Sequence, residues 1–190
     1  MEMQLKKDLL KVARDAIKNY LDRKEKIVVS EDDFPDPESW EDRGTFVTLT
    51  INGKLRGCIG TIVPVRPLIL DVIDNAINAA FRDPRFYPLA REEFFIVNIE
   101  LSILTIPTQL KFSSSKELLN KVRPNIDGVI IRRGPYQATF LPQVWDELPD
   151  KEAFFKHLCL KAGLSEDCFQ MDGLEVYIYH VDSFPEEDFK

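Results

Sequence analysis

The segment that decides the fold of this chain is Asn52-Gly53-Lys54-Leu55-Arg56-Gly57-Cys58-Ile59-Gly60. Apolar and β-branched residues are frequent in the stretches on either side of Asn52-Gly53, at 44–51 and 54–62. Asn-Gly is the strongest short signal for a hairpin, because both central residues of a type I′ turn have positive φ. We therefore expect two antiparallel strands, the second of which carries an arginine and a cysteine two residues apart.

Side-chain alternation predicts which residues of this second strand share a face. Arg56, Cys58 and Gly60 are expected on one face, because successive side chains of a strand point to opposite sides. A two-residue hairpin loop would place Leu49 opposite Arg56 and Val47 opposite Cys58. The arginine and the cysteine would then both have aliphatic neighbours on the first strand.

The chemical role of these residues has two interpretations. Arg56 would favour the thiolate form of Cys58 and make it a nucleophile or a ligand-binding group, or Cys58 is a small buried side chain between glycines. Gly57 and Gly60 either let another backbone pass closely or leave room for a ligand. An arginine among aliphatic side chains needs an acidic partner, because an unpaired buried charge is costly. Glu100 is the candidate for that partner.

Hydrophobic spacing outside the hairpin predicts a mixture of helices and strands. The expected elements are helices over 4–22, 67–82 and 151–162, a short helix opening at 114–117, strands over 94–104 and 174–181, and a second hairpin made of 128–132 and 137–141. These elements do not follow a strict βαβ order, which indicates the α+β class. We therefore expect a largely antiparallel sheet flanked by helices.

The composition argues against a broad nucleic-acid-binding surface and against a membrane protein. The formal net charge is −7, whereas a nucleic-acid interface needs a concentrated basic face. No apolar run approaches the roughly 20 residues of a membrane span, and the N-terminus shows no secretory signal. Three scattered cysteines argue against a disulfide framework and for a reducing compartment. We therefore expect a cytoplasmic protein that binds neither nucleic acid nor membranes.

Metal ligands are sparse in this sequence. The only histidines are His157 and His180, and no set of four cysteines and histidines has the spacing of a zinc site. No phosphate-binding loop or dinucleotide fingerprint occurs either. We therefore expect no metal site, and the sequence identifies no cofactor.

Several short blocks of this sequence, taken together, resemble the AMMECR domain family. They occur in the family's order and cover about residues 5–181. The blocks are Gly44-Thr45-Phe46-Val47-Thr48-Leu49, Leu55-Arg56-Gly57-Cys58-Ile59-Gly60, Asp83-Pro84-Arg85-Phe86, Pro88-Leu89, Glu100-Leu101-Ser102, Asp127-Gly128, Phe140-Leu141-Pro142-Gln143-Val144 and Leu160-Lys161-Ala162-Gly163-Leu164. Each block alone is unspecific, but the combination is highly specific. The layout is similar to that of the stand-alone prokaryotic members called AmmeMemoRadiSam system protein A.

The resemblance implies a single AMMECR-type domain over residues 1–190, built as two unequal lobes around an antiparallel sheet. The smaller lobe is expected within residues 105–145. The resemblance also implies association with a Memo-type protein and a radical-SAM protein, which would act in trans. It brings no established reaction, but it implies that the motif at 55–60 is a functional site.

Two functions from different classes fit these observations. The first is a small-molecule-binding or modifying protein with a pocket at Arg56 and Cys58, which would be its catalytic residues. The substrate-binding candidates are Gly57, Gly60, Arg85, Glu100 and Ser102. The alternative is a non-catalytic partner or adaptor in which the motif at 55–60 is structural. Arg85 has a similar ambiguity, because it could clamp an anion or simply follow the end of a helix.

Overall fold

The hairpin predicted around Asn52 and Gly53 is confirmed. Strand β1 (Thr45–Ile51) and strand β2 (Lys54–Thr61) are antiparallel. Both turn residues have positive φ, 51° at Asn52 and 72° at Gly53. The turn therefore has the backbone that the Asn-Gly pair favours.

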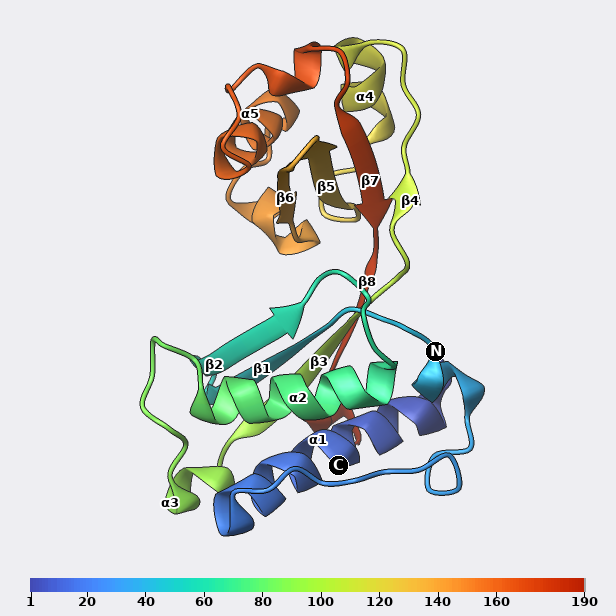
Figure 1. Cartoon of the computed structure of the whole chain (residues 1–190). Coiled ribbons are helices and arrows are strands. Elements are labelled where there is room, and N and C mark those ends of the chain that lie inside the picture. The colour runs from blue at the N-terminus through green and yellow to red at the C-terminus, as the bar shows by residue number, and fades with distance from the viewer. Residues whose placement is uncertain (190) are drawn as a thin grey trace. The chain divides into compact units, whose positions relative to one another are not determined.

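The computed structural model describes residues 1–189 and divides them into two compact units. Unit 1 comprises residues 1–104 and the segment that begins at Asp182, and unit 2 comprises residues 105–181. Each unit contains one four-stranded antiparallel sheet with helices, which confirms the α+β class (Figure 1). Within residues 1–189, no helix is both long enough and apolar enough to cross a membrane.

The sheet of unit 1 has the strand order β2-β1-β3-β8. Its remaining strands are β3 (Asn98–Leu104) and β8 (Val181–Pro185). The predicted long helices are confirmed as α1 (Met3–Arg23) and α2 (Leu68–Phe81), and the short α3 (Arg91–Phe94) precedes β3. Two 3-10 turns complete the unit, η1 (Pro37–Trp40) and η4 (Glu186–Phe189).

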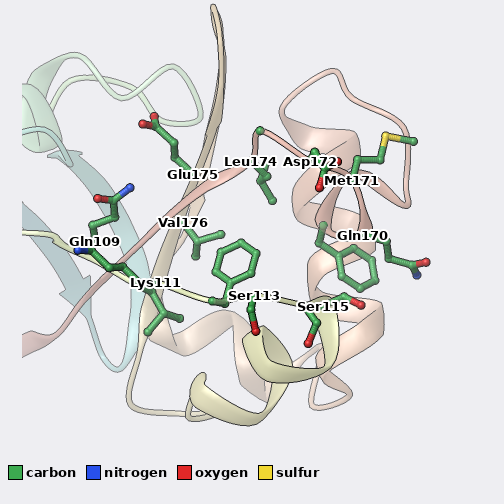
Figure 2. A pocket seen from close by; sticks show the side chains of 15 residues that line it. Gln109, Lys111, Ser113, Ser115, Gln170, Met171, Asp172, Leu174, Glu175 and Val176 are labelled. Carbon is green, nitrogen blue, oxygen red and sulfur yellow. The ribbon is translucent and has the colours of Figure 1, made fainter.

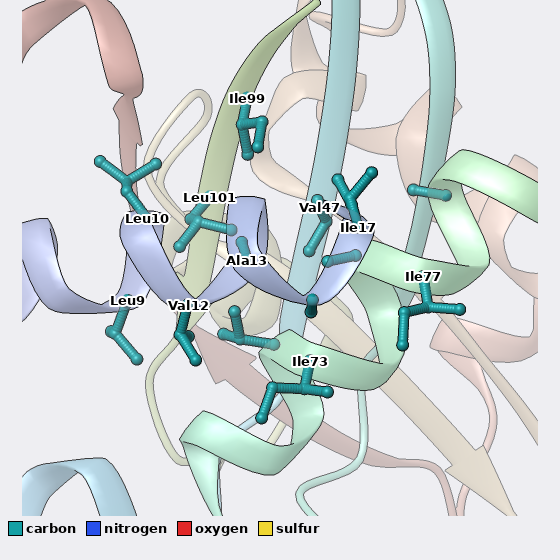
Figure 3. Packing of buried hydrophobic residues seen from close by; sticks show 14 of the residues in the cluster. Leu9, Leu10, Val12, Ala13, Ile17, Val47, Ile73, Ile77, Ile99 and Leu101 are labelled. Carbon is teal, nitrogen blue, oxygen red and sulfur yellow. The ribbon is translucent and has the colours of Figure 1, made fainter. Parts of the chain in front are cut away.

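One apolar core lies between this sheet and the two long helices (Figure 3). Ten of the residues that fill it are each at most 3% exposed: Leu9, Val12, Ala13 and Ile17 of α1, Ile73 and Ile77 of α2, and Val47, Leu49, Ile99 and Leu101 of the strands. Every second residue of β1 and β3 therefore points to the helices. The residues between them form the second face of the sheet, which we call the polar face; it carries Phe46, Thr48 and Thr50 of β1 and Asn98, Glu100 and Ser102 of β3.

A β-bulge in the hairpin changes the predicted pairing. Leu49 lies opposite Gly57 and Thr50 lies opposite Leu55, so Arg56 is an extra residue with no partner on β1. The prediction that Leu49 faces Arg56 and Val47 faces Cys58 was therefore wrong. One inserted residue shifts the register of everything beyond it by one position. Cys58 consequently lies opposite Thr48 and belongs to the polar face.

Unit 2 is built on the second sheet, of strand order β4-β7-β5-β6. The predicted second hairpin is confirmed as β5 (Gly128–Arg133) and β6 (Tyr136–Phe140). The other elements are β4 (Thr108–Gln109), β7 (Glu175–Tyr179), α4 (Ser115–Lys121), α5 (Lys151–Lys161), η2 (Pro142–Asp146) and η3 (Cys168–Gln170). The unit has a separate core, in which Trp145 stacks on Phe154 with ring centroids 3.6 Å apart. The smaller lobe expected within 105–145 thus corresponds to a unit that extends to residue 181.

Two strands differ from their predicted extent. The strand expected over 94–104 begins only at Asn98, so Phe95 lies before it and is 78% exposed. The last strand expected at 174–181 is two strands, β7 and β8, which belong to different sheets. Alternation in the sequence does not show where a continuous extended segment leaves one sheet and enters another.

The cysteines also differ from expectation. Cys159 of α5 and Cys168 of η3 form a disulfide, and both are fully buried in the core of unit 2. The argument from scattered cysteines against a disulfide was therefore wrong. The two cysteines are nine positions apart in sequence, and the chain between them turns back beyond α5. Cys58 remains the free cysteine.

The disulfide should contribute to the stability of unit 2. We expect the double substitution Cys159→Ala/Cys168→Ala to lower the free energy of unfolding by about 2–3 kcal/mol, because the crosslink restricts a short loop in the unfolded chain. Urea unfolding of the oxidised protein and the variant measures this difference. Reductant should destabilise the wild type and leave the double variant unchanged. Titration of three free thiols in the native protein would contradict the assignment.

Candidate functional site

The free edge of β2 is held by the loop that follows α2. The amide of Cys58 donates to Oδ2 of Asp83 (2.8 Å), and Nη2 of Arg85 donates to the carbonyl of Cys58 (3.2 Å). Asp83 is fixed in turn by Arg85, whose Nε and Nη2 donate to its two carboxylate oxygens at 3.0 and 2.7 Å. This loop therefore satisfies the backbone groups of an edge strand that would otherwise be open to pairing.

Arg56 is clamped by an acidic residue that the sequence did not indicate. Its Nε and Nη2 donate to the two carboxylate oxygens of Glu93 on α3, each at 2.8 Å, and Nη2 also donates to the carbonyl of Tyr87 (3.0 Å). The guanidinium lies over the ring of Phe86 at 5.7 Å, and the side chain is only 14% exposed. The prediction that Arg56 needs an acidic partner is confirmed, but Glu100 as that partner is wrong. The bulge frees Arg56 from the ladder of β1, and the acidic side chain that reaches it belongs to α3.

These ion pairs shift the pKa values of their members. The hydrogen bonds from Arg85 hold the pKa of the Asp83 carboxyl far below its ordinary value, and the Cys58 amide acts in the same direction against the effect of burial. The guanidinium of Arg56 likewise lowers the pKa of Glu93, and Glu93 raises the pKa of Arg56. Both carboxyl groups are therefore charged at neutral pH and act as fixed anchors.

Packing explains both glycines of the motif. A Cβ at Gly57 would lie 2.2 Å from the carbonyl oxygen of Ala79, because α2 passes directly over this point of β2. A Cβ at Gly60 would lie 2.3 Å from the ring of Phe46 and 2.5 Å from the carbonyl oxygen of Thr45. Of the two interpretations left open by the sequence, the close approach of protein atoms is the one that the structure shows.

The polar face brings a thiol, a hydroxyl and a carboxylate into one row. Cys58 of β2 lies opposite Thr48 of β1, and Thr48 lies opposite Glu100 of β3. The hydroxyl of Thr48 is 3.4 Å from Sγ of Cys58, and Cys58 is partly exposed. Within residues 1–189, the carboxylate of Glu100 has no hydrogen-bond or ion-pair partner. Adjacent strands are about 4.8 Å apart, so a ligand lying over Thr48 would reach both the thiol and the carboxylate.

A second row on the same face contains Ser102. Gly60, Phe46 and Ser102 lie side by side on β2, β1 and β3. The hydroxyl of Ser102 exchanges a hydrogen bond of 2.8 Å with that of Ser183 on β8, and Ser102 is 5% exposed. Ser102 is thus on the same face as Cys58 but already has a protein partner.

The structure separates the predicted site residues by role. Cys58, Glu100 and Ser102 lie on the polar face, whereas Arg56 and Arg85 are tied to carboxylates beside the strand. The site residues predicted from the sequence did not include Thr48, Asp83 or Glu93. The position of Thr48 beside Cys58 follows only from the strand register of the bulged hairpin. No local sequence pattern pointed to Glu93. In residues 1–189, no group of three or more His, Cys, Asp or Glu side chains is placed to hold a metal ion.

Comparison with known proteins finds similar chains of similar length. The sequence model of the AMMECR1 family matches residues 10–184. A protein from Methanothermobacter thermautotrophicus is 42% identical over 180 residues, covering 94% of this chain and 93% of the relative. One from Methanocaldococcus jannaschii is also 42% identical, covering 93% and 88%. The crystal structure of an uncharacterised protein from Pyrococcus horikoshii is similar with a TM-score of 0.80 at 37% identity, covering 95% and 91%.

The contact between Gly57 and α2 predicts that this glycine cannot be replaced. Gly57→Ala should lower the free energy of unfolding by at least about 2 kcal/mol, because backbone must move to admit the methyl group. Gly53→Ala in the same hairpin is the control, since it meets no atom within 4 Å and should lose only about 1 kcal/mol through its positive φ. If urea unfolding shows the same loss of unfolding free energy for Gly57→Ala and Gly53→Ala, then α2 does not pack against Gly57.

The anchored carboxylate of Asp83 predicts a pH-dependent contribution to stability. We expect Asp83→Asn to cost about 2–3 kcal/mol at pH 7, because hydrogen bonds between charged groups are lost. The pKa of Asp83 is lowered by folding, so its contribution is complete above the unfolded-state pKa of about 4 and is lost as the pH falls further.

The measurement is the difference in unfolding free energy between wild type and Asp83→Asn from pH 3 to pH 7. Asp32→Asn is the control, because Asp32 is exposed and has no partner in the described part of the chain. A difference that stays constant down to pH 3 would contradict the role assigned to the charge.

Proposed function

The chain belongs to the AMMECR1 family, and we propose that it is a small-molecule-binding or modifying protein whose site is the polar face at Cys58. The similar crystal structure from Pyrococcus horikoshii is that of an uncharacterised protein, so the proposal depends on the chemistry of this face. Cys58 is its reactive or ligand-binding group.

The observation that carries this proposal is the row Cys58, Thr48, Glu100. The hydroxyl of Thr48 donates to Sγ of Cys58 and fixes the position of the sulfur on this face. Glu100 has no partner within residues 1–189 and is available to bind a ligand or accept a proton from it. A thiol and a carboxylate separated by one strand suit a ligand that spans about 10 Å across the sheet.

The other candidate residues serve this site in different ways. Arg56 and Arg85 act as positioning residues, because each is held by a carboxylate and fixes β2 rather than pointing to a ligand. Gly57 and Gly60 allow close packing behind and beside Cys58. Ser102 offers a hydroxyl at the next row of the face.

Partners follow from the family resemblance. We propose that the protein acts in trans with a Memo-type protein and a radical-SAM protein and that it does so in the cytoplasm. Because Cys159 and Cys168 form a disulfide, the scattered cysteines no longer argue for a reducing compartment. The proposed cytoplasmic location therefore depends on the proposed partners alone. The net charge of −7 supports a partner other than nucleic acid.

The reactivity of Cys58 tests the site. We expect iodoacetamide to modify Cys58 in the native protein, because the other two cysteines form the disulfide. Thr48→Val should slow this reaction about three- to ten-fold, since a hydrogen bond to sulfur of about 1 kcal/mol is lost. Thr50→Val is the matched control, because Thr50 is on the same strand and face but lies opposite Leu55.

Two results would contradict the proposed site. One is a sulfur that reacts only after the protein unfolds. The other is equal alkylation rates for Thr48→Val and Thr50→Val, which would remove the role of the Thr48 hydroxyl.

A second function is favoured by a different observation. Asp83 and Arg85 bond to the backbone of Cys58, and both motif glycines are required for packing. These contacts would be needed in a non-catalytic partner or adaptor as well. A Cys58→Ala variant that folds normally and supports the cellular role of the protein would favour the adaptor, whereas loss of that role with normal stability would favour the thiol site.

A further inference from the structure

Unit 2 contains a cavity that is separate from the row at Cys58. Its volume is about 470 Å³, within the range of roughly 300–1,000 Å³ typical of small-molecule sites. Two chain segments line it, residues 109–115 and residues 169–176 (Figure 2). All of these residues belong to unit 2.

The cavity forms where β4 and β7 separate. The two strands pair at Thr108 and Gln109, and the last bond between them joins the amide of Leu110 to the carbonyl of Val176 (2.8 Å). Beyond this point one segment continues to α4, and the other turns through Gly173, whose φ of +82° favours glycine. The ladder therefore opens into a space bounded by two extended segments.

The wall formed by residues 169–176 is anchored to the core. It follows directly after Cys168, which the disulfide joins to Cys159 of α5. Phe169, Leu174 and Val176 of this wall are at most 8% exposed and belong to the apolar core of unit 2. Leu110 and Phe112 of the other wall are only partly buried and pack on the same core, so the cavity has an apolar base with groups that a ligand can reach.

Opposite charges stand on the two walls. Figure 2 shows Gln109 and Lys111 on one side and Gln170, Met171 and Asp172 on the other. Neither the ammonium of Lys111 nor the carboxylate of Asp172 has an ion-pair or hydrogen-bond partner in the described part of the chain. Glu175, the third charged residue of the lining, does have a partner: its Oε2 lies 2.6 Å from Nε of Arg132.

We propose that this cavity binds a small zwitterion with an apolar side chain, such as a free amino acid. Lys111 would pair with the carboxylate of the ligand and Asp172 with its ammonium group, while the apolar base accepts the side chain. The amides of Gln109 and Gln170 add hydrogen-bonding groups along the rim. This site is independent of the function proposed for Cys58.

The experiment is a titration of the full chain, with its disulfide intact, followed by the amide resonances in NMR. The probes are L-leucine, L-methionine and L-phenylalanine, together with leucinamide, which lacks the carboxylate, and 4-methylpentanoate, which lacks the ammonium group. We expect saturable shifts confined to residues 109–115 and 169–176. Each single-charge analogue should bind about three- to five-fold more weakly than L-leucine, as for the loss of one partly exposed ion pair.

Two variants assign the charges. Lys111→Gln should weaken the binding of L-leucine but not that of leucinamide. Asp172→Asn should weaken the binding of L-leucine but not that of 4-methylpentanoate. Lys54→Gln and Asp32→Asn make the same charge changes at exposed positions of unit 1 and should have no effect.

The proposal is overturned if none of the three amino acids causes saturable shifts at the lining residues. It is also overturned if leucinamide and 4-methylpentanoate bind as tightly as L-leucine, because the cavity would then recognise only an apolar group.

Discussion

The arrangement at Cys58 depends on one extra residue in β2. The bulge at Arg56 places Gly57 on the side of the sheet that faces the helices, where the backbone of α2 packs closely against it. The bulge also places Cys58 on the polar face beside Thr48. It also releases Arg56 from the ladder, so that the guanidinium can reach Glu93. Without the inserted residue, every side chain of β2 beyond it would exchange faces.

The edge of the sheet imposes the second constraint. Within residues 1–189, β2 has a neighbouring strand on one side only, and an unpaired strand edge invites association with other chains. The segment Asp83-Pro84-Arg85 covers this edge by accepting from the amide of Cys58 and donating to its carbonyl. The same contacts hold Cys58 in place, so protection of the edge and positioning of the thiol are one arrangement. The contacts with Asp83 and Arg85 therefore fix the backbone on both sides of the Cys58 side chain.

The second unit shows how a cavity can arise from ordinary sheet geometry. A two-residue strand, β4, pairs with β7 and then departs to form α4. The cavity is lined by this departing segment and by residues 169–176, which follow the disulfide at Cys168. Lys111 and Asp172 line this space from its two walls, and neither has a partner in residues 1–189.

The sequence alone determined the hairpin, the long helices and the α+β class, because the Asn-Gly turn and the hydrophobic periods act over short distances. It also indicated that Arg56 needs an acidic partner. Only the tertiary structure decided that this partner is Glu93, that Thr48 lies beside Cys58, and that Cys159 and Cys168 are bonded. The first two depend on segments far apart along the chain and on a register shift, and the disulfide depends on how the chain turns back after α5. No local pattern records any of them. The sequence therefore placed the motif on its strand, and packing determined which groups its side chains meet.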